Sequence, residues 1–81
     1  MNKHMADARD FYVLSGKAVW QQRDTLRLTL RDLAKVVGVS ASTISRFENG
    51  KNIDAVNYVS LTNWLLYSAA VRGAGAEGEL R

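Results

Sequence analysis

The segment at residues 29–51, TLRDLAKVVGVSASTISRFENGK, constrains the fold of this chain more than any other. Its first half has apolar residues at the spacing of one helical face: Leu30, Leu33, Ala34 and Val37. Gly38 follows, and glycine readily takes the positive φ that ends a helix. A second helix is expected to begin after Ser40 and to run to about Glu48. The segment therefore predicts two helices joined by a tight turn.

The expected ends of these two helices carry capping residues. Thr29 precedes the first helix and Asp32 follows three residues later, which makes a capping-box-like pair. Ser40 occupies the N-cap position of the second helix. Asn49 and Gly50 then close that helix. These signals indicate where each helix begins and ends.

The second helix of the segment has two faces with different chemistry. Its core anchors are expected at Ile44 and Phe47, packed with Val39 and with Leu30 or Leu33. The opposite face carries small or hydrogen-bonding side chains and one cation: Ala41, Ser42, Ser45 and Arg46. Such a face can approach base edges in a major groove, where serine donates or accepts, alanine contacts a thymine methyl and arginine grips guanine. The pattern favours sequence-specific binding to duplex DNA, and the alternative is an ordinary helical bundle.

Helical patterns continue on both sides of this segment. The stretch from near Asp7 to about Thr25 is either one long helix interrupted by Gly16 or a short helix followed by a second that starts at Ser15. Asp54 caps a last helix that is expected to reach about residue 71. The sequence therefore places helices along most of its length.

These elements predict an all-α domain, a compact bundle of about five helices with a helix-turn-helix, at residues 15–72. Residues 1–14 form an N-terminal extension that can be helical. The tail at residues 73–81, GAGAEGELR, is rich in glycine and alanine and is expected to be flexible, because it cannot bury enough apolar surface to order itself.

The last helix has two neighbouring apolar arcs. The arc assigned to the core contains Ala55, Tyr58, Leu61, Thr62, Leu65 and Ala69. The second arc, which is broken only by Asn63, contains Val56, Val59, Leu66, Tyr67 and Ala70, with Trp64 nearby. A domain this small rarely buries both arcs of one helix. The second arc is therefore either a partner surface, most simply a two-fold dimer contact, or a face that residues 11–14 fold back to cover.

Positive charge gathers around the two central helices. The net charge of the chain is +3, and residues 15–53 hold seven lysines and arginines against three acidic residues. This placement suits binding to a polyanion such as DNA. The alternative interpretation is a solvated charged surface.

Several functional classes lack the residues that they need. The chain has no cysteine, and its single histidine, His4, is isolated near the start, so no metal site and no cofactor are expected. It also has no paired-carboxylate site and no phosphate-cradling glycine loop, so we expect no enzyme. No apolar run is long enough to span a bilayer, and residues 11–14 are too short for a signal peptide. A cytoplasmic location is expected, in the host if the protein comes from a phage.

The stretch LTLRDLAKVVGVSASTISRFENGK resembles the helix-turn-helix of the lambda-repressor-like family, also called the Xre or Cro/repressor type. The family pattern has leucine-threonine, leucine-alanine, a glycine turn, a serine-led helix with an isoleucine, and a closing Glu-Asn-Gly-Lys. The chain matches this pattern at Leu28-Thr29, Leu33-Ala34, Gly38, Ser40 through Ile44, and Glu48-Asn49-Gly50-Lys51. The resemblance extends over roughly residues 15–66 and implies a five-helix all-α domain.

The resemblance implies roles for the matching positions. The third helix of the family reads the major groove, a role that falls here to Ala41, Ser42, Ser45 and Arg46. Residues that flank the reading helix hold phosphates, which implies Thr29, Thr43, Asn49 and Lys51. Arg23 matches a basic residue of the first helix that pairs with the glutamate before Asn-Gly. An ion pair between Arg23 and Glu48 is therefore implied.

The chain also departs from the family pattern. Leu30 stands where members often carry a glutamine that contacts phosphate or supports a base-reading side chain, and leucine cannot do this. Gln22 stands where an apolar residue is usual, so packing around it is expected to differ. The last helix is longer than in many members, which again suggests an assembly surface.

Two functions remain in view. The first is a phage or bacterial transcriptional repressor that binds an inverted-repeat operator as a homodimer and occludes a promoter. The second is an antitoxin-type module that autoregulates its operon while another surface blocks a protein partner. The second apolar arc and residues 11–14 favour the second function.

Overall fold

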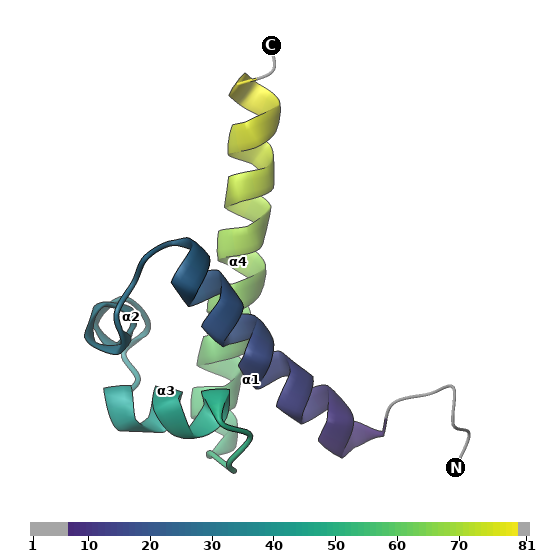
Figure 1. Cartoon of the computed structure of the whole chain (residues 1–81), viewed down its shortest axis with the longest axis vertical. Coiled ribbons are helices and arrows are strands. Elements are labelled where there is room, and N and C mark those ends of the chain that lie inside the picture. Colours follow the sequence, from purple (N-terminus) through teal and green to yellow (C-terminus); the bar gives the residue numbers. More distant parts are fainter. Residues whose placement is uncertain (1–6, 80–81) are drawn as a thin grey trace.

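The computed structural model describes residues 7–79, and the side chains of residues 7–71. Within this range the chain forms four helices: α1 (Ala8–Thr25), α2 (Leu30–Val37), α3 (Ala41–Glu48) and α4 (Ala55–Glu79). Figure 1 shows α1 crossing α4, with α2 and α3 on one side of this pair. The prediction of an all-α fold with a helix-turn-helix is confirmed, with four helices in the described part where about five were expected.

The first helix is continuous. Asp7 caps it, since its carboxylate accepts from the backbone N–H of Asp10 at 2.9 Å. The helix passes through Ser15 and Gly16 without a break, so the single-helix alternative is correct and residues 8–14 are its first turns. Gly16 lies inside the helix because α1 packs directly on the end of α3. A Cβ at this position would overlap the carbonyl oxygen of Phe47, so only glycine permits this approach.

The turn between α2 and α3 follows the local signals in the sequence. Thr29 and Asp32 form a capping box in which each side chain accepts from the other residue's backbone N–H. Gly38 ends α2 with φ +72°, the left-handed conformation that glycine adopts without strain. Ser40 caps α3 by accepting from the N–H of Thr43 at 3.2 Å. The two helices therefore begin and end where the sequence indicates.

Every helix contributes to one core. Its buried apolar side chains are Val19 from α1, Leu33 from α2, Val39 from the turn, Ile44 and Phe47 from α3, and Leu61 from α4. Leu33 is the fully buried anchor of α2, whereas Leu30 is half-buried and packs at the edge. The turn residue Val39 belongs to the core, so the hydrophobic effect as well as the turn fixes α3 against α2.

The last helix is longer than expected and turns one side to the core. Asp54 caps it through the N–H of Asn57 at 2.8 Å, as expected. The backbone stays helical to Glu79 instead of ending near residue 71, since no proline interrupts the alanines and glycines that follow. The flexibility expected for residues 73–81 stays a prediction. Leu61 is buried and Tyr58 and Leu65 pack against the core, but Ala55 and Ala69, which the helical wheel placed in the core arc, are exposed.

The second arc of α4 is exposed. Val56, Val59, Leu66 and Tyr67 are each more than half exposed. The alternative in which residues 11–14 cover this arc is wrong, because Tyr12 packs on Phe47 and Tyr58 while Phe11 and Leu14 remain exposed themselves. Trp64 differs from its neighbours, since it is half-buried and packs against the core.

Gln22 makes a polar contact where an apolar residue is usual in the family. Its Nε2 donates to the hydroxyl of Ser68 on α4 at 3.1 Å, and Ser68 donates to the carbonyl of Leu65. The amide nitrogen of Gln22 is therefore hydrogen-bonded in the α1–α4 contact.

The close approach at Gly16 predicts a large loss of stability on replacement by alanine. Gly16→Ala in a free helix would gain about 1 kcal/mol. Here the added methyl group would force α1 away from the backbone of α3, so we expect the free energy of unfolding to fall by more than about 2 kcal/mol in urea denaturation.

Lys17→Ala, at the exposed next position of the same helix, is the matched control and should change the free energy of unfolding by less than about 0.5 kcal/mol. A Gly16→Ala variant as stable as the parent would contradict the packing described for α1 and α3.

Candidate nucleic-acid interface

The outer face of α3 carries the four residues expected to read bases. Ala41, Ser42, Ser45 and Arg46 stand at i, i+1, i+4 and i+5, which share one side of a helix, opposite Ile44 and Phe47. Ser42 and Arg46 are exposed, and Ala41 and Ser45 are half-buried. Their side chains are small apart from Arg46, so the backbone of α3 can come close to a groove floor.

Arg46 has a partner in the free protein. Its Nη2 donates to the backbone carbonyl of Asn52 at 3.1 Å. The guanidinium therefore lies over the loop that follows α3, at residues 49–54. Four further N–H donors of the side chain are not engaged by this bond, which leaves it able to donate elsewhere.

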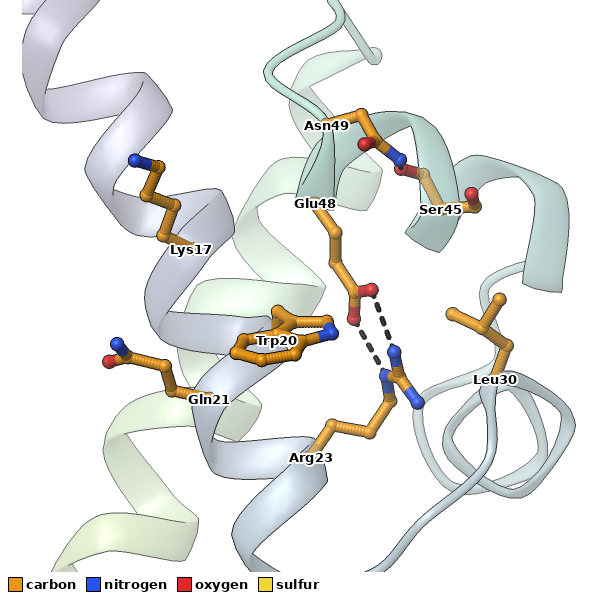
Figure 2. A pocket seen from close by; sticks show the side chains of 8 residues that line it. All are labelled: Lys17, Trp20, Gln21, Arg23, Leu30, Ser45, Glu48 and Asn49. Carbon is orange, nitrogen blue, oxygen red and sulfur yellow. Dashed lines mark hydrogen bonds and ion pairs between the residues drawn. The ribbon is translucent and has the colours of Figure 1, made fainter.

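A bidentate ion pair between α1 and α3 lies under this face. Arg23 Nε donates to Glu48 Oε2 at 2.8 Å and Nη2 donates to Oε1 at 2.9 Å, as the resemblance implies (Figure 2). Arg23 Nη1 also donates to the carbonyl of Leu28 at 2.9 Å, so one guanidinium joins α1, the α1–α2 turn and the end of α3. The side chains are only 15% and 7% exposed, so water competes weakly for these bonds. Glu48 raises the pKa of Arg23 above its ordinary value through this hydrogen bond.

The four residues expected to contact phosphates lie around α3 and differ in the hydrogen bonds that they make in the free protein. Thr29 is engaged in the capping box, and the hydrogen bonds from its backbone and hydroxyl lower the pKa of Asp32 below its ordinary value. Thr43 Oγ1 accepts from the Ser40 hydroxyl at 2.8 Å, which leaves its own proton free to donate. Asn49 Nδ2 donates back to the carbonyl of Ser45 at 2.8 Å. Lys51 is exposed.

Tyr12 holds the loop that carries Lys51. Its hydroxyl donates to the carbonyl of Lys51 and accepts from the N–H of Ile53, both at 2.9 Å. Its ring stacks on Tyr58 with centroids 5.5 Å apart and meets the edge of Phe47 at 5.2 Å. The first turns of α1, whose role the sequence left open, therefore fix the loop after α3.

A cleft between α1 and α3 brings in residues that the sequence reasoning missed. Lys17, Trp20 and Gln21 of α1 line it together with Ser45 and Asn49 of α3. Leu30 of α2 and the Arg23–Glu48 pair complete its walls (Figure 2). Trp20 is 48% exposed, which is unusual for a tryptophan in so small a domain. Lys17, Trp20 and Gln21 stand at i, i+3 and i+4 on α1, a spacing that could have indicated from the sequence that they share one face.

Comparison with known families agrees with this arrangement. The family model for the helix-turn-helix of lambda-repressor (Xre) type matches residues 21–61, half of the chain. The chain belongs to this helix-turn-helix family. No curated protein and no solved structure matches it.

Membership makes the chain a DNA-binding transcription regulator of Xre type. The matched range contains α2, α3, both members of the Arg23–Glu48 pair and the start of α4. Two structural findings stand beside it. Within residues 7–79 no helix is long and apolar enough to cross a membrane. Among the side chains of residues 7–71, no three acidic or histidine side chains are grouped to hold a metal ion.

The largely buried Arg23–Glu48 pair predicts a marked loss of stability when one partner is neutralised. Glu48→Gln leaves the guanidinium with weaker acceptors, so we expect the free energy of unfolding to fall by about 2–4 kcal/mol. Arg23→Gln should cost a similar amount. The double variant should lose clearly less than the two single losses together, which a double-mutant cycle in urea measures.

Asp24→Asn removes an exposed carboxylate next to Arg23 and serves as the control, with an expected change under about 0.5 kcal/mol. Additive losses from Arg23 and Glu48 would show that the two side chains do not act as a pair.

The hydroxyl of Tyr12 predicts a second, smaller effect. Tyr12→Phe keeps the aromatic contacts but leaves the Lys51 carbonyl and the Ile53 N–H without their partner, so the free energy of unfolding should fall by about 1–2 kcal/mol. Faster hydrogen exchange at the Ile53 amide should accompany it. Tyr67→Phe removes a hydroxyl from an exposed tyrosine and should leave both measurements unchanged.

Proposed function

We propose that this regulator is a repressor of the Cro/repressor type, from a phage or a bacterium, that binds an operator and occludes a promoter. The observation that carries the proposal is the outer face of α3, whose side chains are mostly small and polar. The Arg23–Glu48 pair fixes the last residue of this helix to α1. A helix with this surface fits a major groove.

In this proposal Ala41, Ser42, Ser45 and Arg46 read bases. Arg46 contributes most to discrimination, because a bidentate contact with guanine is worth about 1–3 kcal/mol. It keeps its bond to Asn52 in the free protein and redirects its remaining donors to the base. Ser42 and Ser45 accept several bases and tune the preference.

Phosphate contacts supply affinity. Thr29, Thr43, Asn49 and Lys51 lie around α3 and are proposed to hold the backbone on either side of the groove. Lys17 and Trp20 border the same cleft as Ser45 and Asn49, so α1 extends this contact. Lysine and arginine near the reading face release counterions from DNA, which makes binding weaken with salt.

We propose that the protein binds an inverted repeat as a homodimer, at the nucleoid in the cytoplasm or in the cytoplasm of a phage's host. Two copies with half-sites one helical turn apart, roughly 34 Å, would place both α3 helices in successive major grooves on one side of the duplex.

A second candidate is an antitoxin-type module that autoregulates its operon and blocks a protein partner. The exposed side chains of Phe11 and Leu14 on α1 favour it, because exposed apolar side chains that lie close together can bind a protein partner. An adjacent toxin gene in the genome would support this candidate.

The test is binding to a duplex selected from a random pool, with the parent and with Arg46→Ala combined with Ser42→Ala. The double variant should lose about 1–3 kcal/mol of discrimination between the selected and a scrambled duplex and keep its weak binding to the scrambled one. Retained discrimination would contradict base reading by α3.

Lys51→Ala should weaken binding to both duplexes alike and reduce the slope of log affinity against log salt by about 1. Arg9→Ala removes an equal charge outside residues 15–53 and is the control, with an unchanged slope. If the two variants behave alike, the loop at Lys51 is not a phosphate contact.

A further inference from the structure

Helix α4 lacks the charged residues that are usual on a helix surface exposed to water. From Ala55 to Val71 it carries no charged residue on any side. Its inner side packs on the core through Leu61, yet its outer side is also apolar and exposed. Helices of globular proteins that face water usually carry charges there, and a helix that is apolar all round is normally buried. The outer side of α4 is therefore built to be covered.

The exposed apolar surface is continuous and reaches α2. One hollow is lined by Ala55, Val56, Val59 and Ser60. A second hollow is lined by Val36, Val37, Ser60, Asn63, Trp64 and Tyr67. Ser60 belongs to both, so they adjoin. We call this the α4 surface, made of Val56, Val59, Asn63, Leu66 and Tyr67 on α4 and Val36 on α2.

The order of residues along α4 has the spacing of a helix–helix seam. Val56, Val59, Asn63, Leu66 and Ala70 follow one another at intervals of three, four, three and four. This is the repeat that keeps one face of a helix against a partner helix. The one polar residue, Asn63, stands in the middle of the seam, and a polar residue there sets register in helix pairs.

We propose that the α4 surface binds a second copy of this chain, with the two α4 helices antiparallel and crossing at Asn63. The carboxamide of Asn63 has a donor and an acceptor, so two copies of it on a two-fold axis satisfy each other. The absence of charge from residue 55 to residue 71 removes any like-charge repulsion between identical surfaces and offers nothing to a charged partner.

The antiparallel arrangement matches large side chains with smaller ones. With Asn63 on the axis, Tyr67 of each copy faces Val59 of the other, and Val56 faces Ala70. A parallel pair would place Tyr67 against Tyr67, where the two rings clash. It would also place Ala70 against Ala70, where the two methyl groups leave a gap. Facing positions that alternate in size pack at the density of a protein interior.

The exposed area is sufficient for a specific contact. Val56, Leu66 and Tyr67 are 76%, 70% and 71% exposed, and Val36 is 63% exposed. With Val59, these side chains offer roughly 600 Å² per copy, so two copies bury at most about 1,200 Å² when all of it is covered, the lower end of stable protein interfaces. Area alone does not set the affinity, and for a contact at this lower end without charged anchors we expect a dissociation constant of about micromolar.

The first test is sedimentation of the full chain without DNA across a concentration series. The parent should form a dimer near micromolar concentration and no larger species. Leu66→Glu, which buries a carboxylate in the contact, should raise the dimer dissociation constant at least about a hundredfold while circular dichroism and thermal unfolding show a folded monomer. Leu14→Glu, at an exposed apolar position of α1, should leave the dimer intact. A parent that stays monomeric at 100-fold higher concentration, on the order of 100 μM, overturns the proposal.

The second test uses the absence of cysteine from the chain, since any introduced cysteine is then the one thiol. Asn63→Cys should form a disulfide between copies under mild oxidation, and so should a mixture of Val59→Cys and Tyr67→Cys chains. Val59→Cys alone should not, because the two copies of residue 59 would lie about 12 Å apart along the helices, beyond disulfide reach. Cross-linking of Val59→Cys alone in place of the mixture overturns the antiparallel arrangement.

The proposal concerns the dimer of the proposed function but is tested without DNA. A chain that dimerises and fails to select a duplex retains the α4 surface and refutes base reading by α3. A chain that selects a duplex and stays monomeric retains base reading by α3 and refutes the α4 surface as a dimer contact.

Discussion

The bidentate pair of Arg23 and Glu48 is the interaction on which the position of α3 in the helix-turn-helix depends. It joins helices that are far apart in sequence and ties the turn before α2 to the same guanidinium. A short helix such as α3 has little stability of its own. Its orientation comes from the core side chains Ile44 and Phe47 on one side and from this pair at its end. Because the pair is largely buried, its geometry leaves α3 few other positions.

The loop after α3 is fixed by a second set of contacts, from both sides. Tyr12 holds the backbone of Lys51 and Ile53, and Arg46 holds the carbonyl of Asn52. The rings of Tyr12, Phe47 and Tyr58 pack together beneath this loop. The groups proposed to meet bases and those proposed to meet phosphates are thus parts of one rigid body. Binding to DNA then costs little ordering entropy, which favours affinity.

Local signals predicted much of this architecture. The capping box at Thr29, the glycine turn at Gly38 and the cap at Ser40 act within a few residues, so the sequence alone is enough to locate them. The Arg23–Glu48 pair came from the resemblance to the family. Contacts between distant residues were not accessible in this way. The fit of Gly16 against the Phe47 carbonyl and the bonds of Tyr12 to the loop depend on how α1 crosses α3, which no local pattern states. Periodicity found both arcs of α4 and could not decide what covers the outer one.

The most direct test of the account is chemical-shift mapping of the ¹⁵N-labelled chain titrated with a selected duplex. With the outer face of α3 in the major groove, as proposed, the largest changes should fall on the amides of residues 40–46 and 49–51, with smaller ones at Lys17 and Trp20 in α1. If the amides of α3 stay unchanged while those of another helix move, this helix does not read DNA and the account is wrong.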